Sequence, residues 1–168
     1  MIKGLYPFGL NHYRSLKFQK LRKLISKNQR EIKVEGAYGS SLSFLMIDIF
    51  SSINQQIFYI SKSKETASYV YSDIVELIGE KNCSFLPSNY RSDAKKIKDE
   101  SNIINRSKTI RDILDKETKI IVTYPEAIFE KIPDEKEIDS KTINIEKGQF
   151  LKINSINELL FDLKFEKD

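Results

Sequence analysis

Residues 36–43 read GAYGSSLS and have the outline of a phosphate-binding loop. In a working loop, the pattern G-x-x-x-x-G-K-[ST] lets backbone N–H groups cradle phosphate, the lysine reaches the β and γ phosphates, and the hydroxyl binds Mg²⁺. Gly36 matches the first glycine and Ser43 keeps the hydroxyl. Ser41, however, replaces the last glycine, and Leu42 replaces the lysine. Leu42 offers a triphosphate no charge, and the Cβ of Ser41 stands where the backbone must approach the phosphates closely.

These two replacements predict a vestigial loop that binds no triphosphate tightly and hydrolyses none. The free N–H groups of a helix N-terminus are still able to hold a sulfate or phosphate. The alternative is an ordinary strand-to-helix turn, because short glycine patterns also match by chance. The residues of the vestigial loop are Gly36, Gly39, Ser40, Ser41, Leu42 and Ser43.

No other residue type points to a catalytic or metal site. Cys83 is the only cysteine, so an internal disulfide and a cysteine zinc cluster are excluded, and a small buried side chain is expected. His12 is the only histidine, and a surface position is expected for it rather than a place in a Ser-His-Asp triad. Asp48 lies in an apolar segment without metal-ligand neighbours, and it faces either a polar partner or the surface. The sequence therefore predicts no catalytic residue, no metal and no cofactor in this segment.

The composition fits one domain, or one domain and part of a second. The 168 residues are 40% hydrophobic and 31% charged, so a packed core is expected. The net charge of +4 and the pI near 9.0 are too mildly basic to argue for nucleic acid by themselves. No run approaches the roughly 20 apolar residues of a membrane span, and the N-terminus lacks the apolar core of a signal peptide. A reduced, cytoplasmic location is the simplest expectation.

Apolar periodicity predicts short strands and helices in alternation. The run at residues 57–60 is typical of a strand buried on both faces of a parallel sheet, and residues 119–123 form the clearest strand. Gly79 is expected to end the preceding helix, and Pro125 to begin a short one. This order predicts an α/β fold with a parallel sheet. The expected strands are residues 32–35, 57–60, 83–87 and 119–123, and the expected helices are residues 12–30, 43–53, 65–78, 102–114 and 126–131.

The chain changes character after Pro133. Residues 134–139 are acidic and polar, and residues 142–145 partly alternate like a strand. Ser155 is placed to cap one more helix, which is expected to end at residue 163. A lone strand and helix make a poor domain. We therefore expect residues 132–168 to open a second, α+β domain inside which the sequence ends, as in a fragment or a truncated product.

An ordered series of sequence blocks resembles the N-terminal module of the bacterial transcription-repair coupling factor, Mfd. The most telling are GSS at residues 39–41, PSNYR at residues 87–91 and VTYPEA at residues 122–127. The resemblance runs from about Val34 to the end of the chain. The longer blocks are VEGAYGSSLSFL, FYISKSKETASYVYSDI, IINRSKTIRDIL, IIVTYPEAIFEKIP and KGQFLKINSINELLFDL.

That module is similar to the nucleotide-excision-repair protein UvrB, which carries an intact phosphate loop and a long aromatic β-hairpin. Here the loop is degenerate at Ser41 and Leu42, and residues 88–101 are too few for the hairpin. Both departures favour the coupling factor. The resemblance implies a helicase-like, P-loop NTPase-type three-layer domain at residues 1–131, including the basic N-terminal helix. It also implies that residues 132–168 begin an inserted UvrA-binding domain.

The resemblance further implies partners and a role. The family couples stalled RNA polymerase to excision repair by recruiting UvrA, and its UvrA-contacting residues would lie beyond Asp168. ATP, Mg²⁺, duplex DNA and RNA polymerase would be bound by other domains of a full-length parent, so this segment is expected to be non-catalytic. Tyr90 and Arg91 align with a region of UvrB that faces DNA and are the candidate DNA contacts. Arg106 matches a recurrent arginine of the family, and we expect it to form an ion pair that holds its helix.

Two other classes of function stay open. A nucleotide-binding α/β domain would need another cation in place of the missing lysine, such as Lys62 or Lys64. A small nucleic-acid-binding protein would contact phosphates through the basic helix at residues 12–30. Charge runs on helices are, however, usually the solvated faces of core-packed helices. The missing lysine and the ordered blocks favour the non-catalytic module.

Overall fold

The computed structural model describes residues 16–27, 29–90, 99–134, 136, 138, 147–150 and 152–162. The chain divides into two compact units, residues 1–130 and residues 131–168. The first unit contains a sheet with its helices, and the second contains α7 (Ile153–Asp162). Helix α7 begins two residues before Ser155, so the prediction that Ser155 caps this helix is wrong. The predicted strand at residues 142–145 lies outside the described residues.

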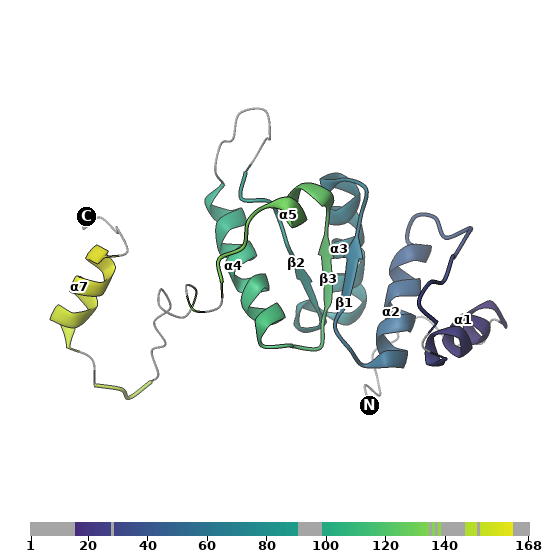
Figure 1. The fold of residues 1–168 in the computed structure, drawn as a ribbon, viewed down its shortest axis with the longest axis horizontal. Coiled ribbons are helices and arrows are strands. Elements are labelled where there is room, and N and C mark those ends of the chain that lie inside the picture. Colours follow the sequence, from purple (N-terminus) through teal and green to yellow (C-terminus); the bar gives the residue numbers. More distant parts are fainter. Residues whose placement is uncertain are drawn as a thin grey trace. The chain divides into compact units, whose positions relative to one another are not determined.

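The sheet has three parallel strands, β1 (Ile57–Ile60), β2 (Cys83–Phe85) and β3 (Ile120–Thr123) (Figure 1). Their order is β1-β3-β2, so the last of these three strands along the chain lies in the middle. Ile120 is opposite both Ile57 and Cys83. All four residues of β3 are buried, as expected of a short β-branched run with strands on both sides. The predicted mixed α/β class and parallel sheet are confirmed.

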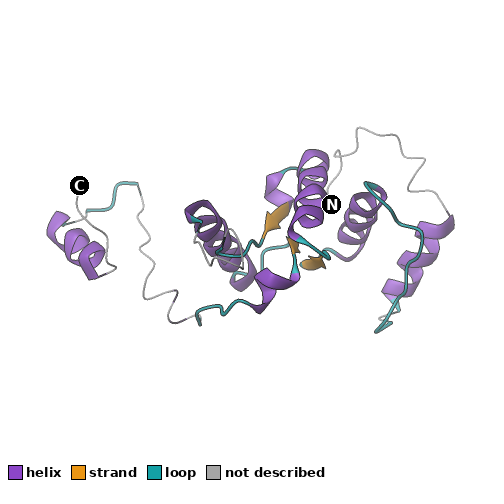
Figure 2. Ribbon diagram, turned by 90° about the horizontal axis from the view of Figure 1, so that it is seen from above, coloured by secondary structure: helices purple, strands orange, loops and turns teal. Residues whose placement is uncertain are grey.

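Helices cover both faces of this sheet. Helices α2 (Ser41–Ile53) and α3 (Lys64–Ile78) lie on one face, and α4 (Glu100–Leu114) lies on the other (Figure 2). Helix α3 packs against β2 and β3, and α2 packs against α3. The helix α1 (Leu16–Ser26) packs on α2 and does not reach the strands. The main hydrophobic core lies between the sheet and the α2–α3 layer, and it contains Ile47, Phe50, Ala67, Val70, Ile74, Ile78, Cys83, Ile120, Val122, Tyr124 and Ala127.

The sequence explains locally where the helices begin and end. At the start of α3, Oγ of Ser63 accepts a hydrogen bond from the N–H of Thr66. Gly79 follows the helix with a φ of 81°, a conformation that glycine adopts without strain, and a 3₁₀ turn (Glu80–Asn82) leads into β2. Asp99 caps α4 by accepting from the N–H of Ser101, so α4 begins two residues before the predicted residue 102. The short α5 (Pro125–Phe129) begins with proline, as predicted.

The segment before the glycine loop differs from the prediction. Residues 32–35 were expected to form a strand, but the structure places no strand there. A strand depends on a neighbour, and no described strand lies beside this segment. The basic helix also ends earlier than the predicted residue 30, because α1 stops at Ser26, while residues 12–15 lie outside the described residues. Among the described residues, no helix has the length and apolar character that crossing a membrane requires.

Candidate functional site

The glycine loop turns sharply just before α2. Gly36 and Gly39 have φ values of 83° and 54°, both in the left-handed region where a side chain would be strained. Tyr38, between them, is 82% exposed. Ser40, which precedes the helix, makes no side-chain capping bond. The turn therefore owes its shape to the two glycines, and another side chain must satisfy the first N–H groups of the loop.

That side chain is Ser41. Its Oγ accepts from the N–H of Tyr38 at 2.7 Å and donates to the carbonyl oxygen of the same residue at 2.6 Å. The N–H of Ser41 also donates to the Tyr38 carbonyl, at 3.2 Å, and the N–H of Leu42 donates to the Gly39 carbonyl, at 3.1 Å. Three N–H groups at the helix entrance are thus bonded inside the loop. A phosphate would have to displace these bonds before it could be cradled.

The hydroxyl at the Mg²⁺ position is also engaged. Ser43 is fully buried, and its Oγ donates to Oδ2 of Asp73 in α3 at 3.1 Å. This bond places the first turn of α2 beside the middle of α3. Leu42 is half-buried and carries no charge. The side chains that would bind metal and phosphate in a working loop contribute here to helix packing.

A mostly apolar cavity of about 530 Å³ lies beside the loop. It is bounded by α1, by residues 32–37 and by the start of α2. Two lysines, Lys20 and Lys33, contribute to its lining, and Lys33 forms an exposed ion pair with Glu35 at 2.7 Å. Glycine-loop residues supply only a small part of the wall. The apolar side chains of the lining are Phe18, Leu21, Leu24, Ile32, Val34, Ala37 and Leu45.

The two lysines suggested as substitutes for the missing one lie at the start of α3. Lys62 is exposed and Lys64 is half-buried. No hydrogen bond or ion pair seen among the described residues joins either lysine to the glycine loop. Glu65 shares this helix end, where its own N–H and then the Ser63 hydroxyl lower the pKa of its carboxyl by hydrogen bonding. The negatively charged carboxylate of Glu65 thus already compensates the partial positive charge of the α3 N-terminus.

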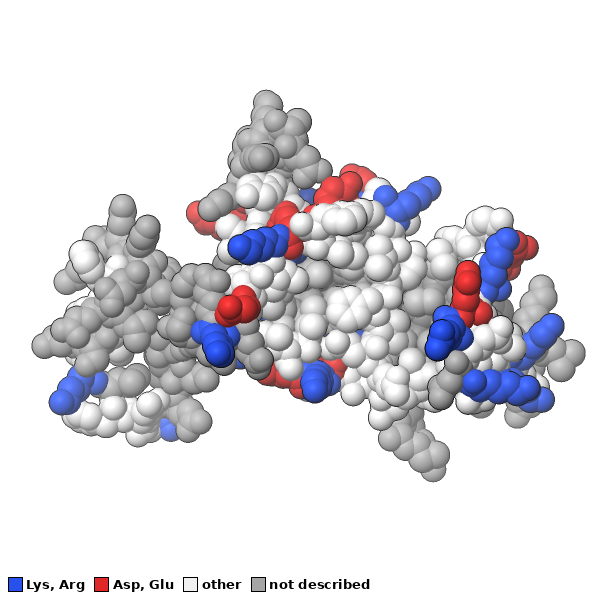
Figure 3. All heavy atoms as spheres, viewed as in Figure 1, with Lys and Arg blue, Asp and Glu red and all other residues white. Residues whose placement is uncertain are grey.

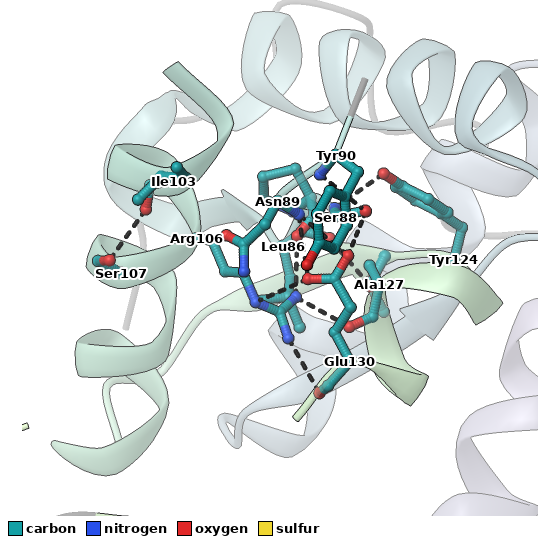
Figure 4. Close-up of polar contacts among 12 residues, drawn as sticks. Leu86, Ser88, Asn89, Tyr90, Ile103, Arg106, Ser107, Tyr124, Ala127 and Glu130 are labelled. Carbon is teal, nitrogen blue, oxygen red and sulfur yellow. Dashed lines mark hydrogen bonds and ion pairs between the residues drawn. The ribbon is translucent and has the colours of Figure 1, made fainter. Parts of the chain in front are cut away.

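A buried polar network joins the carboxyl ends of β2 and β3 (Figure 4). Arg106 of α4 is 2% exposed and donates to the carbonyl oxygens of Pro87 at 2.9 Å, Ala127 at 2.8 Å and Glu130 at 3.2 Å. Its Nε lies 3.6 Å from Oε2 of Glu130. Burial lowers the pKa of Arg106, and the Glu130 carboxylate opposes this effect. The predicted ion pair that holds this helix is confirmed.

The same network explains the loop that follows β2. The Glu130 carboxylate accepts from the Ser88 hydroxyl. Its two oxygens also accept from the N–H of Asn89, Oε1 at 3.1 Å and Oε2 at 3.0 Å. The N–H of Ser88 donates to the Tyr124 hydroxyl at 2.8 Å. Each of these side chains has a protein partner, so the cluster is a structural support. Sequence reasoning missed Glu130 and Tyr124, since nothing in their local pattern shows that they meet residues some 40 positions earlier.

The candidate DNA contacts are only partly within the described structure. Tyr90 is half-buried, and its N–H donates to Oγ of Ser88 at 3.2 Å, so its backbone is tied to the Arg106 network (Figure 4). Arg91 lies outside the described residues. Within those residues, no group of three or more metal-ligating side chains is found.

Two buried carboxylates have charged partners; the sequence left a polar partner or the surface open for Asp48 and did not single out Asp112. Asp48, 1% exposed in α2, accepts from Arg22 of α1 in a two-pronged ion pair, with Nε at 3.0 Å from Oδ2. Asp112 of α4 accepts from the Ser84 hydroxyl at 2.7 Å and from Lys119 at 2.9 Å. An acidic residue inside an apolar run is the sequence signal that pointed to Asp48, and the structure identifies its polar partner.

No protein-family model matches the chain, and no curated protein matches it either. The class defined by the structure is therefore a mixed α/β protein with a small, open parallel sheet.

Proposed function

We propose that the chain is a non-catalytic interaction module, corresponding to the N-terminal UvrB-like part of a transcription-repair coupling factor. One observation carries the non-catalytic half of this proposal. The glycine loop bonds its own N–H groups through Ser41 and Tyr38 and uses Ser43 for packing, while Leu42 supplies no charge. Such a loop offers a triphosphate no cation, and three of the N–H groups at the helix entrance already have partners.

The ordered blocks shared with the coupling factor support the rest of the proposal. Residues 1–131 would be the helicase-like, P-loop NTPase-type domain of that module, and residues 132–168 would begin its UvrA-binding domain. The role would be to help bring UvrA to stalled RNA polymerase in the cytoplasm. ATP, Mg²⁺ and duplex DNA would be handled by the motor of a longer parent protein.

The loop is tested by calorimetric titration of the intact chain with ATP and Mg²⁺. We expect no micromolar binding and no turnover. The variant Leu42→Lys is expected to stay inactive, because the loop remains closed through the bonds of Ser41. The double variant Ser41→Gly, Leu42→Lys frees the N–H of Tyr38 and restores a charge, so it is expected to gain affinity. Micromolar binding by the unaltered chain would overturn the proposal.

The partner is tested separately. We expect UvrA to be retained by a parent protein that carries the complete second domain. Affinity that persists when that domain is deleted would contradict the assignment of UvrA binding to the part that begins at residue 132.

A further inference from the structure

The cavity beside the glycine loop is apolar in its depth and charged at its mouth. Leu21 of α1 and Leu45 of α2 are 9% and 8% exposed and form its floor. Leu24 is half-buried in the wall, whereas Val34 and Lys20 are exposed at the mouth. The volume of about 530 Å³ is within the range of small-molecule sites, which are likewise mostly apolar with a few polar groups.

The walls of this cavity are held by contacts that the structure already contains. The ion pair between Arg22 and the buried Asp48 attaches α1 to α2. Gly36, with its φ of 83°, turns the chain from the third wall toward α2. The hydrogen bonds between Ser41 and Tyr38 then fix the entrance of that helix. A ligand that enters a site with fixed walls does not pay for ordering them.

The charge around the mouth is positive. Residues 16–37 include seven basic and two acidic residues, and Figure 3 shows Lys and Arg side chains gathered at the end of the sheet unit where α1 lies. Lys33 is engaged by Glu35. The side chain of Lys20 forms no hydrogen bond or ion pair within the part of the chain that the structure describes. It lies one helical turn from Leu24 on the same side of α1, so its ammonium group is available to an anion at the mouth.

We propose that this cavity binds a small amphipathic anion, namely a molecule with an apolar chain and a single carboxylate. The chain lies against Leu21, Leu24 and Leu45, and the carboxylate remains near Lys20 in contact with water. A chain enters with its methyl end first, because the floor is apolar and the cation is at the mouth. The ligand is therefore a free acid, since a lipid held in a bilayer presents its headgroup first.

A polyphosphate does not suit the same cavity. Its floor is made of leucine side chains, which donate no hydrogen bond, and Ser41 at its edge is already bonded to Tyr38. A buried polyanion would therefore lose its hydration without gaining partners. The carboxylate of an amphipathic acid avoids this cost, because it stays at the mouth. The inference does not depend on the proposed function, which concerns the N–H groups of the glycine loop and a separate partner.

Calorimetric titration of the full chain with monomeric decanoate tests the site. We expect saturable binding of one molecule, with an affinity that rises up to about fourfold for each CH₂ added between octanoate and decanoate. Decylammonium has the same chain and the opposite charge, so it is expected to bind more weakly. Decanoate should also raise the urea midpoint of unfolding, as a ligand of the folded state does, whereas a surfactant that binds the unfolded chain lowers it.

Two pairs of variants locate the ligand. Ala37→Leu adds bulk to the cavity wall and is expected to weaken decanoate binding by about tenfold, whereas Tyr38→Leu, at an exposed position outside the lining, should leave it unchanged. Lys20→Gln is expected to weaken binding about two- to fivefold, as the loss of an exposed ion pair does. Lys23→Gln, an exposed change in the same helix but outside the lining, is its matched control.

Three outcomes would overturn the proposal. The first is the absence of saturable decanoate binding by the full chain, or binding that does not depend on chain length. The second is equal affinity in Ala37→Leu and Tyr38→Leu, which would place the ligand outside the cavity. The third is equal affinity in Lys20→Gln and Lys23→Gln, which would separate the carboxylate from Lys20. Urea unfolding shows which variants fold, and the comparison of the two exposed lysines decides the matter if Ala37→Leu does not.

Discussion

Arg106 holds together three segments that are distant in sequence. From α4, its guanidinium group donates to carbonyl oxygens of the loop after β2, of α5 and of Glu130 just after α5. Arginine suits this role because its planar group presents several donors in a fixed geometry. The carbonyl oxygens would lose these partners if the side chain were shortened, and the Glu130 carboxylate would lose its cation.

We predict that Arg106→Met lowers the free energy of unfolding by about 3–5 kcal/mol, the usual cost of removing one member of a buried pair. Arg106→Lys keeps the charge but cannot reach all three carbonyl oxygens, so it is also expected to destabilise the protein. Lys108→Met, on the exposed side of the same helix, is the control and should change stability by less than about 0.5 kcal/mol. Urea unfolding measures all three, and equal values for Arg106→Met and Lys108→Met would refute the prediction.

Because of Cys83, the free energy of unfolding is expected to depend on pH in the alkaline range. Burial raises the pKa of its thiol to about 12. The pKa of a cysteine thiol in an unfolded chain is about 8.5. Above that pH the unfolded chain loses the proton while the folded chain keeps it, so stability falls as pH rises. We predict a decline approaching about 1.4 kcal/mol per pH unit from this group.

Urea unfolding between pH 7 and about 9.5 measures this decline, below the range in which tyrosines ionise. The variant Cys83→Ala is less stable at every pH because it leaves a small cavity, but its stability should depend less on pH. Identical slopes for the two proteins would show that the thiol is not the cause.

At the scale of elements, one ion pair attaches α1 to α2. Arg22 is one of the basic residues that gave α1 the pattern of a nucleic-acid contact, yet its guanidinium group is directed at the buried Asp48. The pair lies at the interface of the two helices and explains why an acidic residue is tolerated in an apolar helix.

We predict that Arg22→Met destabilises the protein by about 1–3 kcal/mol, because it leaves Asp48 buried without a cation; the cost is below that of a fully buried pair since Arg22 is partly exposed. Asp48→Leu should cost less, and the double variant Arg22→Met, Asp48→Leu should recover much of the loss. A double-mutant cycle by urea unfolding measures the coupling. Additive effects would mean that the two side chains do not stabilise each other.

The strands of the sheet could be predicted, while the position of one segment could not. Residues 57–60 and 119–123 are short β-branched and aromatic runs, and their strands are confirmed. The expectation that residues 57–60 are buried on both faces is wrong, because Phe58 and Ile60 are exposed on one face of this edge strand. Residues 32–35 have an equally good pattern, but a strand also needs a neighbour, and local sequence does not contain that information.

The candidate site was predictable only in residue type. The sequence alone shows that Leu42 stands at the position where a working loop has its lysine. The bonds by which Ser41 closes the loop on Tyr38 depend on backbone angles at the two glycines, and no motif records them. Glu130 was missed for a similar reason, because the fold alone brings its carboxylate to Ser88.

At the scale of the whole molecule, the sheet unit contains its own core. The main hydrophobic cluster and the Arg106 network both lie within residues 1–130. We predict that a chain shortened to residues 1–134 unfolds cooperatively in urea with a midpoint close to that of the intact sheet unit. A chain shortened to residues 1–124 loses α5 and the Glu130 carboxylate and should be markedly less stable. Loss of cooperative unfolding in the 1–134 chain would contradict the prediction.

The open edge of β1 has a consequence for handling the protein at high concentration. Residues 49–61 carry no charge, and the stretch from Gln55 to Ser61 has neither proline nor glycine. Such segments can stack in register and form the steric zippers of amyloid. The first charge beyond β1 is that of Lys62, which acts as a gatekeeper.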